Sequence, residues 1–246
     1  MEKLKYHFGK LKINKNKKTP MVQEVFSKIS QKYDLMNDLM SLGFHRLWKK
    51  ELIEIMNIEN NENIIDIGAG TGDLAFQIYK KNPNAFVTSV DLNLDMLKVG
   101  LEKKKKNKCN NIFINANAEN LPFKNNSFDK YVISFCLRNI TFMETALDEA
   151  LRVLKPNGIF YCLEFSSPKL KSLSKFYDFY KSKIIPKIGK YIAKNEDAYN
   201  YLDQSISMFP NQELLKAILI KKGFNNVSNI NFFNGIVSLH IGYKTI

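Results

Sequence analysis

The chain has 246 residues, 45% of them hydrophobic, which is enough for one domain with a substantial core. Its formal net charge is +13, and no run of 18 apolar residues argues for a membrane-spanning helix. The cysteines are isolated, with no Cys-x-x-Cys or Cys/His cluster, so we expect reduced thiols, a cytoplasmic protein and no structural metal: they are Cys109, Cys136 and Cys162.

The excess positive charge is concentrated in two segments. Residues 1–20 carry seven lysines and one acid, and residues 169–194 carry eight lysines and one acid, which together account for all of it. Such segments fit anionic membrane headgroups or nucleic acid, although a solvated lysine-rich surface explains them equally well. Only three arginines occur, which indicates positions that need a planar, fixed donor fork: Arg46, Arg138 and Arg152.

The predicted elements alternate along the chain. We expect residues 1–20 to be flexible and residues 21–246 to form one domain, beginning with helices at 22–29 and 47–56. We then predict strands at 64–67, 86–90, 112–115, 130–135 and 159–165, and helices at 74–81, 94–104, 143–154 and 214–222. Strands at 227–233 and 237–243 form a closing hairpin across Asn234-Gly235, a two-residue turn signal. This order predicts an α/β fold with a parallel sheet and helices on both faces.

Residues 169–205 interrupt the alternation. Apolar side chains recur there at helical spacing with lysines between them: Leu173, Phe176, Tyr177, Tyr180 and Ile184. The pattern predicts an amphipathic basic helix that Pro186 ends or kinks. A lid over an apolar substrate, a membrane-surface helix and an ordinary core-covering helix all fit this pattern.

The most informative stretch is residues 63–73. An apolar run ends in Gly68, Gly70 and Gly72, and a helical stretch follows at once. Glycine permits positive φ and lets a ligand lie against the backbone. A second strand ends about 20 residues later in Asp91, whose carboxylate can accept both hydroxyls of a ribose. The combination predicts a site for a nucleoside-like cofactor, the alternative being a turn that only packs strand on helix.

The glycine spacing distinguishes this loop from a dinucleotide site. The dinucleotide fingerprint Gly-x-Gly-x-x-Gly places a pyrophosphate at a helix N-terminus, whereas the glycines here alternate and Asp73 begins the helix. A carboxylate at that place repels a pyrophosphate and suits a ligand with an amino group and a sulfonium. The loop and its acids resemble the S-adenosylmethionine site of class I methyltransferases: Asp66, Gly68, Gly70, Thr71, Gly72 and Asp91.

Four further segments resemble one family. They are Tyr-Asp-Leu-Met-Asn-Asp with its continuation to residue 49, the segment 118–129 around Leu-Pro-Phe, Ser-Phe-Cys-Leu-Arg-Asn-Ile-Thr at 134–141, and Arg-Val-Leu-Lys-Pro with Leu-Glu-Phe-Ser at 152–166. From about Val22 to the C-terminus the chain resembles the quinone-biosynthesis C-methyltransferases, which methylate demethylmenaquinol and polyprenyl methoxybenzoquinol. This resemblance implies the Rossmann-like class I fold, with a seven-stranded, mostly parallel sheet and a helical lid at 169–205.

The resemblance also implies S-adenosylmethionine as the cofactor and supplies its contacts: Thr71, Asp91, Asn117, Ala118 and Ser134. We expect Asp91 at the ribose, Asn117 and Ala118 at the adenine and Ser134 at the methyl-donor end, because ligands of such sheets bind at the carboxyl ends of the strands. Most relatives have glycine where this chain has Cys136, which adds a side chain beside the expected substrate pocket.

The implied reaction is methyl transfer to a ring carbon of a reduced polyprenyl quinol, in ubiquinone or menaquinone biosynthesis or both. A phenolic hydroxyl must lose or share its proton, and the ring C–H is lost afterwards. The candidate catalytic residues are Arg138, Asn139, Tyr33 and His45, and Asp34 and His240 are further candidates for handling protons. Arg138 can stabilise a phenolate or orient a water, and His45 has the ordinary pKa of a base, although a structural role for His45 or Tyr33 is the alternative.

Two other functions remain as alternatives. A methyltransferase acting on RNA is motivated by the charge, but the Asn/Asp-Pro-Pro-Tyr motif for exocyclic amines is absent after strand 130–135, so we expect no nucleic-acid partner. A non-catalytic cofactor-binding subunit of a quinone-biosynthesis assembly is disfavoured by the intact loop. Peripheral contact with an anionic membrane at its inner face and homo-oligomer formation stay open.

Overall fold

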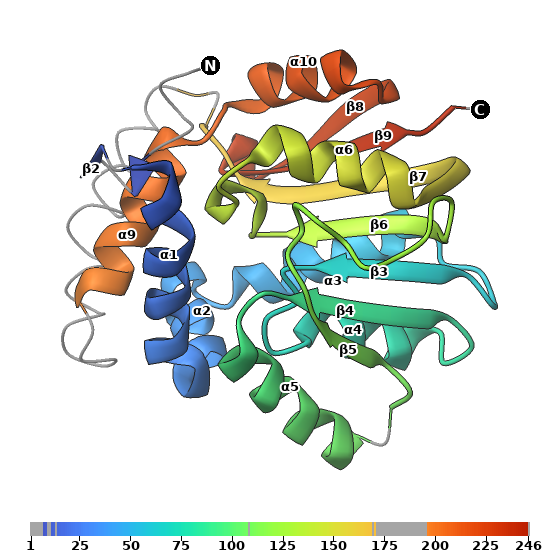
Figure 1. The fold of residues 1–246 in the computed structure, drawn as a ribbon, viewed down its shortest axis with the longest axis horizontal. Helices are drawn as coiled ribbons and strands as arrows, with labels where there is room; N and C mark the ends of the chain where they lie inside the picture. The colour runs from blue at the N-terminus through green and yellow to red at the C-terminus, as the bar shows by residue number, and fades with distance from the viewer. Residues whose placement is uncertain are drawn as a thin grey trace.

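The computed structural model describes residues 7–8, 11–12, 14–107, 109–168, 170 and 196–245. Seven strands form one sheet in the order β5-β4-β3-β6-β7-β9-β8 (Figure 1). The pairs from β5 to β7 are all parallel, and β9 is antiparallel to both of its neighbours. The predicted α/β class, a mostly parallel sheet closed by a hairpin, is confirmed.

The strands of this sheet are β3 (Asn63–Ile67), β4 (Phe86–Asp91), β5 (Ile112–Asn115), β6 (Phe128–Ser134), β7 (Leu154–Phe165), β8 (Asn225–Phe232) and β9 (Val237–Tyr243). A separate antiparallel pair is formed by β1 (His7–Phe8) and β2 (Leu11–Lys12). The helices are α1 (Lys15–Ile29), α2 (Tyr33–Ser41), α3 (Phe44–Met56), α4 (Asp73–Lys81), α5 (Leu94–Asn107), α6 (Met143–Val153), α9 (Glu196–Met208) and α10 (Gln212–Lys222). Short 3-10 helices are η2 (Ser30–Lys32), η3 (Leu137–Asn139) and η6 (Phe233–Gly235).

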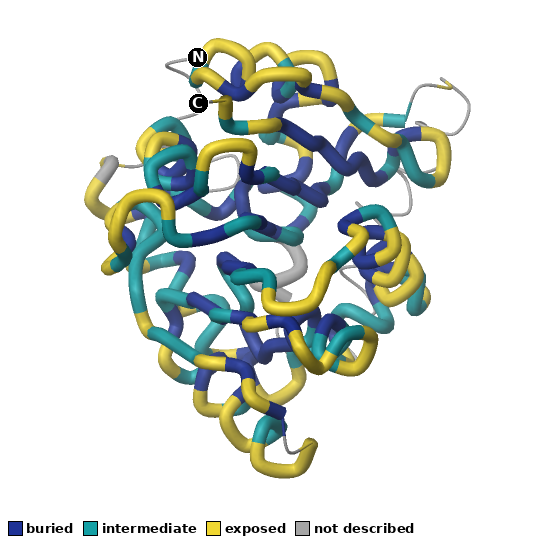
Figure 2. Tube along the Cα trace, turned by 90° about the vertical axis from the view of Figure 1, so that its right-hand side faces the viewer, coloured by how far each residue is buried: buried dark blue, intermediate teal, exposed yellow. Residues whose placement is uncertain are grey.

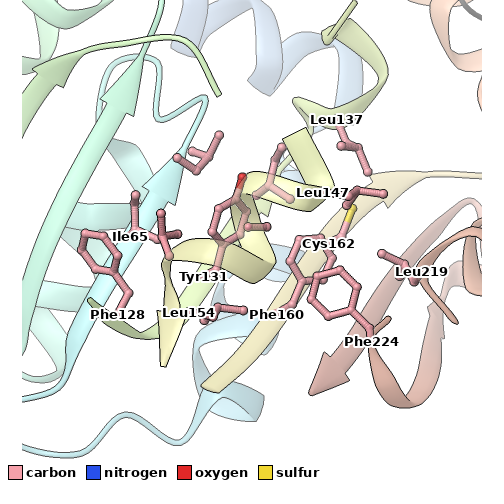
Figure 3. Packing of buried hydrophobic residues seen from close by; sticks show 14 of the residues in the cluster. Ile65, Phe128, Tyr131, Leu137, Leu147, Leu154, Phe160, Cys162, Leu219 and Phe224 are labelled. Carbon is pink, nitrogen blue, oxygen red and sulfur yellow. The ribbon is translucent and has the colours of Figure 1, made fainter. Parts of the chain in front are cut away.

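Helices cover both faces of the sheet because side chains alternate along each strand. Ile65, Tyr131 and Phe160 are register neighbours on β3, β6 and β7, and they pack in one core cluster with residues of α6 and α10 (Figure 3). Val132 and Tyr161 belong to a second cluster, formed with α3 and α4. Both clusters consist of nearly inaccessible apolar side chains. In Figure 2 the buried stretches of the chain lie mainly in the interior and the exposed stretches at the periphery. Each such side chain contributes roughly 1.5–3 kcal/mol by its burial.

A third, smaller cluster closes the carboxyl-end side of the sheet. There α1, α2 and α9 lie together beside the strand ends (Figure 1), and their shared apolar residues are Ile29, Met36, Met40, Leu202 and Ile206. None of the helices in the described part of the chain has the apolar length needed to cross a membrane. The predicted basic helix around 173–186 lies outside the described residues, and of the predicted insertion only residue 170 and residues 196–205 are described, the latter within α9.

Three local features differ from the predictions. Helix α1 begins at Lys15, so the boundary expected at residue 20 falls inside a helix, and α2 was not predicted. The closing hairpin is present, but Phe232 pairs with Val237, so the connection is longer than two residues. Its 3-10 turn holds two non-glycine residues, Phe233 and Asn234, at φ of 47° and 58°. The Asn-Gly signal is typical of a two-residue turn, so it predicted a connection that is too short.

Candidate active site

Two adjoining recesses lie at the carboxyl ends of the strands, beneath α1 and α2. The first holds about 750 Å³ of space open to solvent, and the predicted site residues in its wall are Tyr33, Gly68, Gly70, Asp91, Asn117, Ala118 and Asn139. The second holds about 760 Å³, and the predicted site residues in its wall are Tyr33, Asp34, His45, Gly68, Thr71, Ser134 and Arg138. Tyr33, Gly68 and Phe135 line both recesses, so the two form one connected site.

The glycine loop between β3 and α4 forms the floor of this site. Gly68, Gly70 and Gly72 have φ of 64°, 58° and 79°, a region that side chains rarely adopt. A Cβ on Gly68 would lie 2.1 Å from Sγ of Cys136. Cys136 therefore packs directly against the loop and lines the first recess, beside the glycine that both recesses share.

Asp91 ends β4 and fastens the loop. Its Oδ2 accepts the backbone N–H of Gly70 at 2.8 Å, and its Oδ1 accepts that of Asn93 at 2.7 Å. Burial raises the pKa of this carboxyl, against the backbone N–H groups that lower it. An ionised carboxylate has about four acceptor positions, so these two bonds leave capacity for two hydroxyl donors of a ligand.

Beyond β5, Asn117 and Ala118 form the wall opposite α1. The Asn117 side-chain oxygen accepts the backbone N–H of Glu119 at 3.0 Å, which fixes its orientation. Helix α1 contributes Val22 and Phe26 to the same recess. A flat heterocycle can therefore lie between apolar side chains and a positioned amide.

Thr71 is tied to two helices by its hydroxyl. Its Oγ1 donates to Asp34 of α2 at 2.8 Å and accepts from Lys103 of α5 at 2.8 Å, and Lys103 also pairs with Asp34. These three side chains form a clasp that joins α2 and α5 to the glycine loop. The clasp gives Asp34 a structural task, and nothing in its contacts supports the expected proton-handling role.

The negative charge of Asp73, the first residue of α4, is compensated by an ion pair. Lys49 of α3 donates to its Oδ2 at 2.9 Å. Although burial works in the opposite direction, Lys49 holds the pKa of Asp73 at about 2. Lys49 therefore compensates the negative charge that the loop sequence suggested for a cationic ligand, and this lysine, 24 residues away along the chain, gives no signal in the loop sequence.

Among the predicted cofactor contacts, Oδ2 of Asp66 on β3 and Oγ of Ser134 on β6 are buried with no hydrogen-bond partner in the described part of the chain. Burial raises the pKa of Asp66 to about 7, and this residue lines neither recess, whereas Ser134 lines the second. Buried polar groups are normally satisfied, so Ser134, with the glycine floor and Asp91, fits a ligand that joins a nucleoside to a polar chain.

Arg138 is held in the wall of the second recess. Its Nη1 donates to Oε1 of Glu164 at 2.5 Å and to the carbonyl of Phe135 at 2.7 Å, and its guanidinium lies 5.4 Å from the ring centroid of Phe165. Burial opposes the charge, but Glu164 raises the pKa, so Arg138 stays cationic. The sequence singled out the segment that contains Glu164 without assigning this residue a role.

Asn139 and Tyr33 complete the polar rim. Asn139 Oδ1 accepts from the hydroxyl of Tyr201 in α9 at 3.0 Å and lines the first recess. Tyr33 faces both recesses, and burial raises its pKa against the lowering effect of Lys49 and Arg138. Tyr33 therefore remains a protonated phenol near neutral pH and can donate a hydrogen bond.

The two histidines expected to handle protons lie in different places. His45 lines the second recess with its Nδ1 2.7 Å from Ser41 Oγ, and since that hydroxyl donates to the Asn37 carbonyl, Nδ1 carries the proton and Nε2 is an acceptor. Burial and Lys49 lower the pKa of His45 to about 4, so the ordinary basicity expected from sequence is wrong. His240 bonds the Gln212 carbonyl at 2.9 Å and lines neither recess.

Solved structures of other proteins share this fold. An S-adenosylmethionine-dependent methyltransferase from Aquifex aeolicus superposes with a TM-score of 0.61 at 14% identity, covering 80% of this chain and 89% of that one. A methyltransferase from Thermotoga maritima, described as a possible histamine N-methyltransferase, gives 0.61 at 19% identity, covering 91% and 100%. At these identities the likeness concerns the fold alone, and it confirms the class I methyltransferase architecture.

Sequence relatives are much closer. The ubiquinone/menaquinone biosynthesis C-methyltransferase UbiE of Rickettsia bellii is 46% identical, with 97% of this chain and 98% of the relative covered. The UbiE proteins of Yersinia enterocolitica and Brucella suis are 45% and 44% identical, covering 99% and 98% of this chain and 98% and 91% of the relatives. The model of the ubiE/COQ5 methyltransferase family matches residues 11–244. The chain therefore belongs to the ubiE/COQ5 methyltransferase family.

Proposed function

We propose that the protein transfers a methyl group from S-adenosylmethionine to a ring carbon of a reduced polyprenyl quinol, in ubiquinone or menaquinone biosynthesis or both. The observation that carries this proposal is the junction of the two recesses at Gly68 and Phe135, with Asp91 in one and Arg138 in the other. A bound cofactor and a quinol ring can meet at that junction. Relatives at about 45% identity over the full chain carry the name of this activity, which supports the assignment.

Binding of the cofactor falls to the floor, the first recess and the adjoining wall of the second recess. Asp91 would accept the ribose hydroxyls, and Asn117 and Ala118 would face the adenine. Thr71 would lie at the amino-acid end and Ser134 at the methyl-donor end, both in the wall of the second recess. Ser134 would gain the partner that its buried oxygen lacks. When bound, S-adenosylmethionine supplies an electrophilic methyl group on a sulfonium.

The second recess would bind the ring of the quinol. Arg138 stays charged, so it would stabilise a phenolate oxygen, and this increases the electron density of the ring carbon that is methylated. Tyr33 would donate to the second ring oxygen, and Nε2 of His45, a weak base because of its lowered pKa, would take the released proton only in passage to solvent. Phe135 and Phe165 give apolar walls, and Met40 and Leu202 continue them toward α9.

The redox state of the ring provides the test. Only the reduced quinol has an electron-rich carbon, so labelled methyl should reach a short-chain demethyl quinol kept under dithionite, and not its oxidised quinone. RNA should receive none. Transfer to RNA alone would contradict the proposal in favour of a nucleic-acid methyltransferase, and binding of cofactor without transfer to any quinol would favour a non-catalytic subunit.

Contact with an anionic membrane is a second proposal, carried by the eight lysines and single acid of residues 169–194, which lie almost wholly outside the described residues. Basic residues near such a surface contribute about 1 kcal/mol each. Glutamine at positions Lys175, Lys181, Lys183 and Lys187 should weaken sedimentation with phosphatidylserine vesicles. Unchanged sedimentation would reject this proposal and leave the methyl-transfer assignment intact.

A further inference from the structure

A buried ammonium group lies over the glycine loop. Lys49 projects from α3 into the second recess, where its side chain is 11% exposed, and its Nζ bonds Asp73, the residue that directly follows Gly72. Gly68, Ala69, Thr71 and Ser134 line the same recess. The cation is thus placed beside the backbone turn that receives the polar end of the cofactor.

The other two cations of this recess are paired with carboxylates other than Asp73. Arg46 donates from Nε and Nη2 to the two oxygens of Asp38 at 2.6 and 2.7 Å, and its side chain is half exposed. Arg138 donates from Nη1 to Glu164 and to the Phe135 carbonyl on the β6–β7 side. Lys49 is the cation whose partner directly follows the glycine loop.

The ammonium of Lys49 has hydrogens to spare. It carries three donors, and within the described residues its hydrogen bond is the one to Asp73. Asp73 is in turn oriented by Gln77, which donates to its other oxygen at 3.2 Å. Burial opposes the charge of Lys49, but Asp73 and Tyr33 keep its pKa above the ordinary value, so the donors remain charged. A buried cation with unused donors at a ligand recess is suited to a second carboxylate.

We propose that Lys49, held in place by Asp73, binds the α-carboxylate of the methionine part of the cofactor. The inference rests on S-adenosylmethionine as the cofactor of the proposed function, but not on the identity of the methyl acceptor. Lys49 is then a binding residue that fixes the amino-acid end, so that the sulfonium faces the junction of the two recesses. The alternative occupant of the position beside Lys49 is a phenolate of the quinol, and the two ligands compared below distinguish it from the cofactor carboxylate.

The test compares two ligands that differ only in that carboxylate. Calorimetry without any quinol measures binding of S-adenosylmethionine and of decarboxylated S-adenosylmethionine, which keeps the sulfonium and the amine. Wild-type protein should prefer the carboxylated ligand, and Lys49→Met should weaken its binding about 10- to 100-fold while changing the affinity for the decarboxylated ligand less than about twofold. Lys49→Arg, which retains the charge, should restore most of the difference.

Two controls separate this role from structural effects. In Lys49→Met the freed Asp73 could repel the ligand carboxylate, so Lys49→Met/Asp73→Asn must show the same selective loss. Lys130→Met removes another buried lysine, paired with Glu62 and lining neither recess, and should leave both affinities unchanged. Equal losses for both ligands, no loss at all, or recovery in the double variant would overturn the proposal. Failure of wild-type protein to bind either ligand would instead overturn the cofactor assignment.

Discussion

Asp91 combines a structural and a binding task in one carboxylate. It holds Gly70 and Asn93 by their backbone N–H groups and retains acceptor positions that face the first recess. Asp91→Ala should therefore weaken binding of S-adenosylhomocysteine by roughly 100-fold or more, because charge-assisted hydrogen bonds contribute about 1.5–3 kcal/mol each. Calorimetry measures the loss. Asp95→Ala, which removes an exposed carboxylate paired with Lys98 nearby, is the matched control, and equal affinity in the two variants would refute the ribose assignment.

Substitution of Arg138 should affect the rate of methyl transfer more than the affinity for the cofactor. Lysine keeps the charge beside Glu164 but loses the planar fork, so Arg138→Lys should reduce kcat about 100-fold or more while the cofactor Kd changes less than about twofold. Steady-state kinetics with the reduced quinol give kcat. Arg152→Lys changes an arginine that forks onto Glu149 outside both recesses and should retain wild-type kcat. Unchanged turnover in Arg138→Lys would leave this residue as a purely structural partner of Glu164.

His45 should make the fold sensitive to acid. Its pKa is about 4 in the folded protein against about 6.5 in the unfolded chain, so the unfolded state binds more protons between these values. The contribution is fully present above about pH 6.5 and is lost as the pH falls through about 4, which amounts to about 2 kcal/mol between pH 7 and pH 5. Urea unfolding of wild type and His45→Asn at both pH values checks this. An identical pH dependence in the two proteins would contradict it.

For individual residues, the sequence predicted which side chains belong to the site better than it predicted the partners of those side chains. The scarcity of arginine did mark positions with carboxylate partners, since Arg46, Arg138 and Arg152 pair with Asp38, Glu164 and Glu149. The neighbours Lys49 and Glu164 shift the pKa values of Asp73 and Arg138, yet each lies more than 20 residues from the group that it pairs with. Pattern and spacing report local structure, so a pair formed only by tertiary packing has no signal in them.

Helix α1 acts as a roof fixed at two points. Lys18 donates to the Ile140 carbonyl at 2.9 Å and Thr19 bonds Thr141 at 2.7 Å, while Asn93 holds the Gln23 carbonyl farther along the helix. Burial lowers the pKa of Lys18 to about 8, against the raising effect of Glu119. These contacts join α1 to the segment that carries Arg138 and Asn139. The region expected to be a flexible, solvated charge run therefore contributes a buried lysine that attaches α1 above the site.

Loosening this roof should weaken cofactor binding without touching the glycine loop. Lys18→Met/Thr19→Val removes the bonds to Ile140 and Thr141, so we expect faster amide hydrogen exchange in α1 and a 3- to 10-fold higher Kd for the cofactor, since each hydrogen bond contributes about 0.5–1.5 kcal/mol. Lys17→Met, a change at an exposed neighbour on the same helix, is the control. Slow exchange and an unaltered Kd in the double variant would show that α1 needs no such attachment.

The elements themselves were largely predictable because each has a local cause. Short apolar runs specified the strands, and 3.6-residue periodicity specified α4, α5, α6 and α10, with Gly223 at the end of α10 in the left-handed conformation that helix ends favour. Helix α2 was missed although Met36 and Met40 recur at helical spacing, because its nine residues bury only these two side chains. The connection between β8 and β9 was misjudged because its left-handed phenylalanine, Phe233, has no propensity signal.

In the molecule as a whole, the candidate active site lies at one edge of the sheet. Alternating strands and helices predict parallel order, and parallel order brings the carboxyl ends of β3, β4, β5 and β6 together, so the position of the site followed from sequence. The volume and division of the site did not, because they depend on α1 and α2 packing against strand ends far along the chain. The resemblance supplied the residues, and the structure supplied their mutual contacts.

The central claim is methylation of carbon in a reduced ring, and the product can be examined directly. With ¹³C-methyl S-adenosylmethionine and a reduced demethyl quinol, ¹³C NMR of the extracted product should show the label as a methyl group bonded to a ring carbon. The oxidised quinone should give no labelled product under the same conditions. A labelled methoxy group, or label on the ring irrespective of its redox state, would contradict the account.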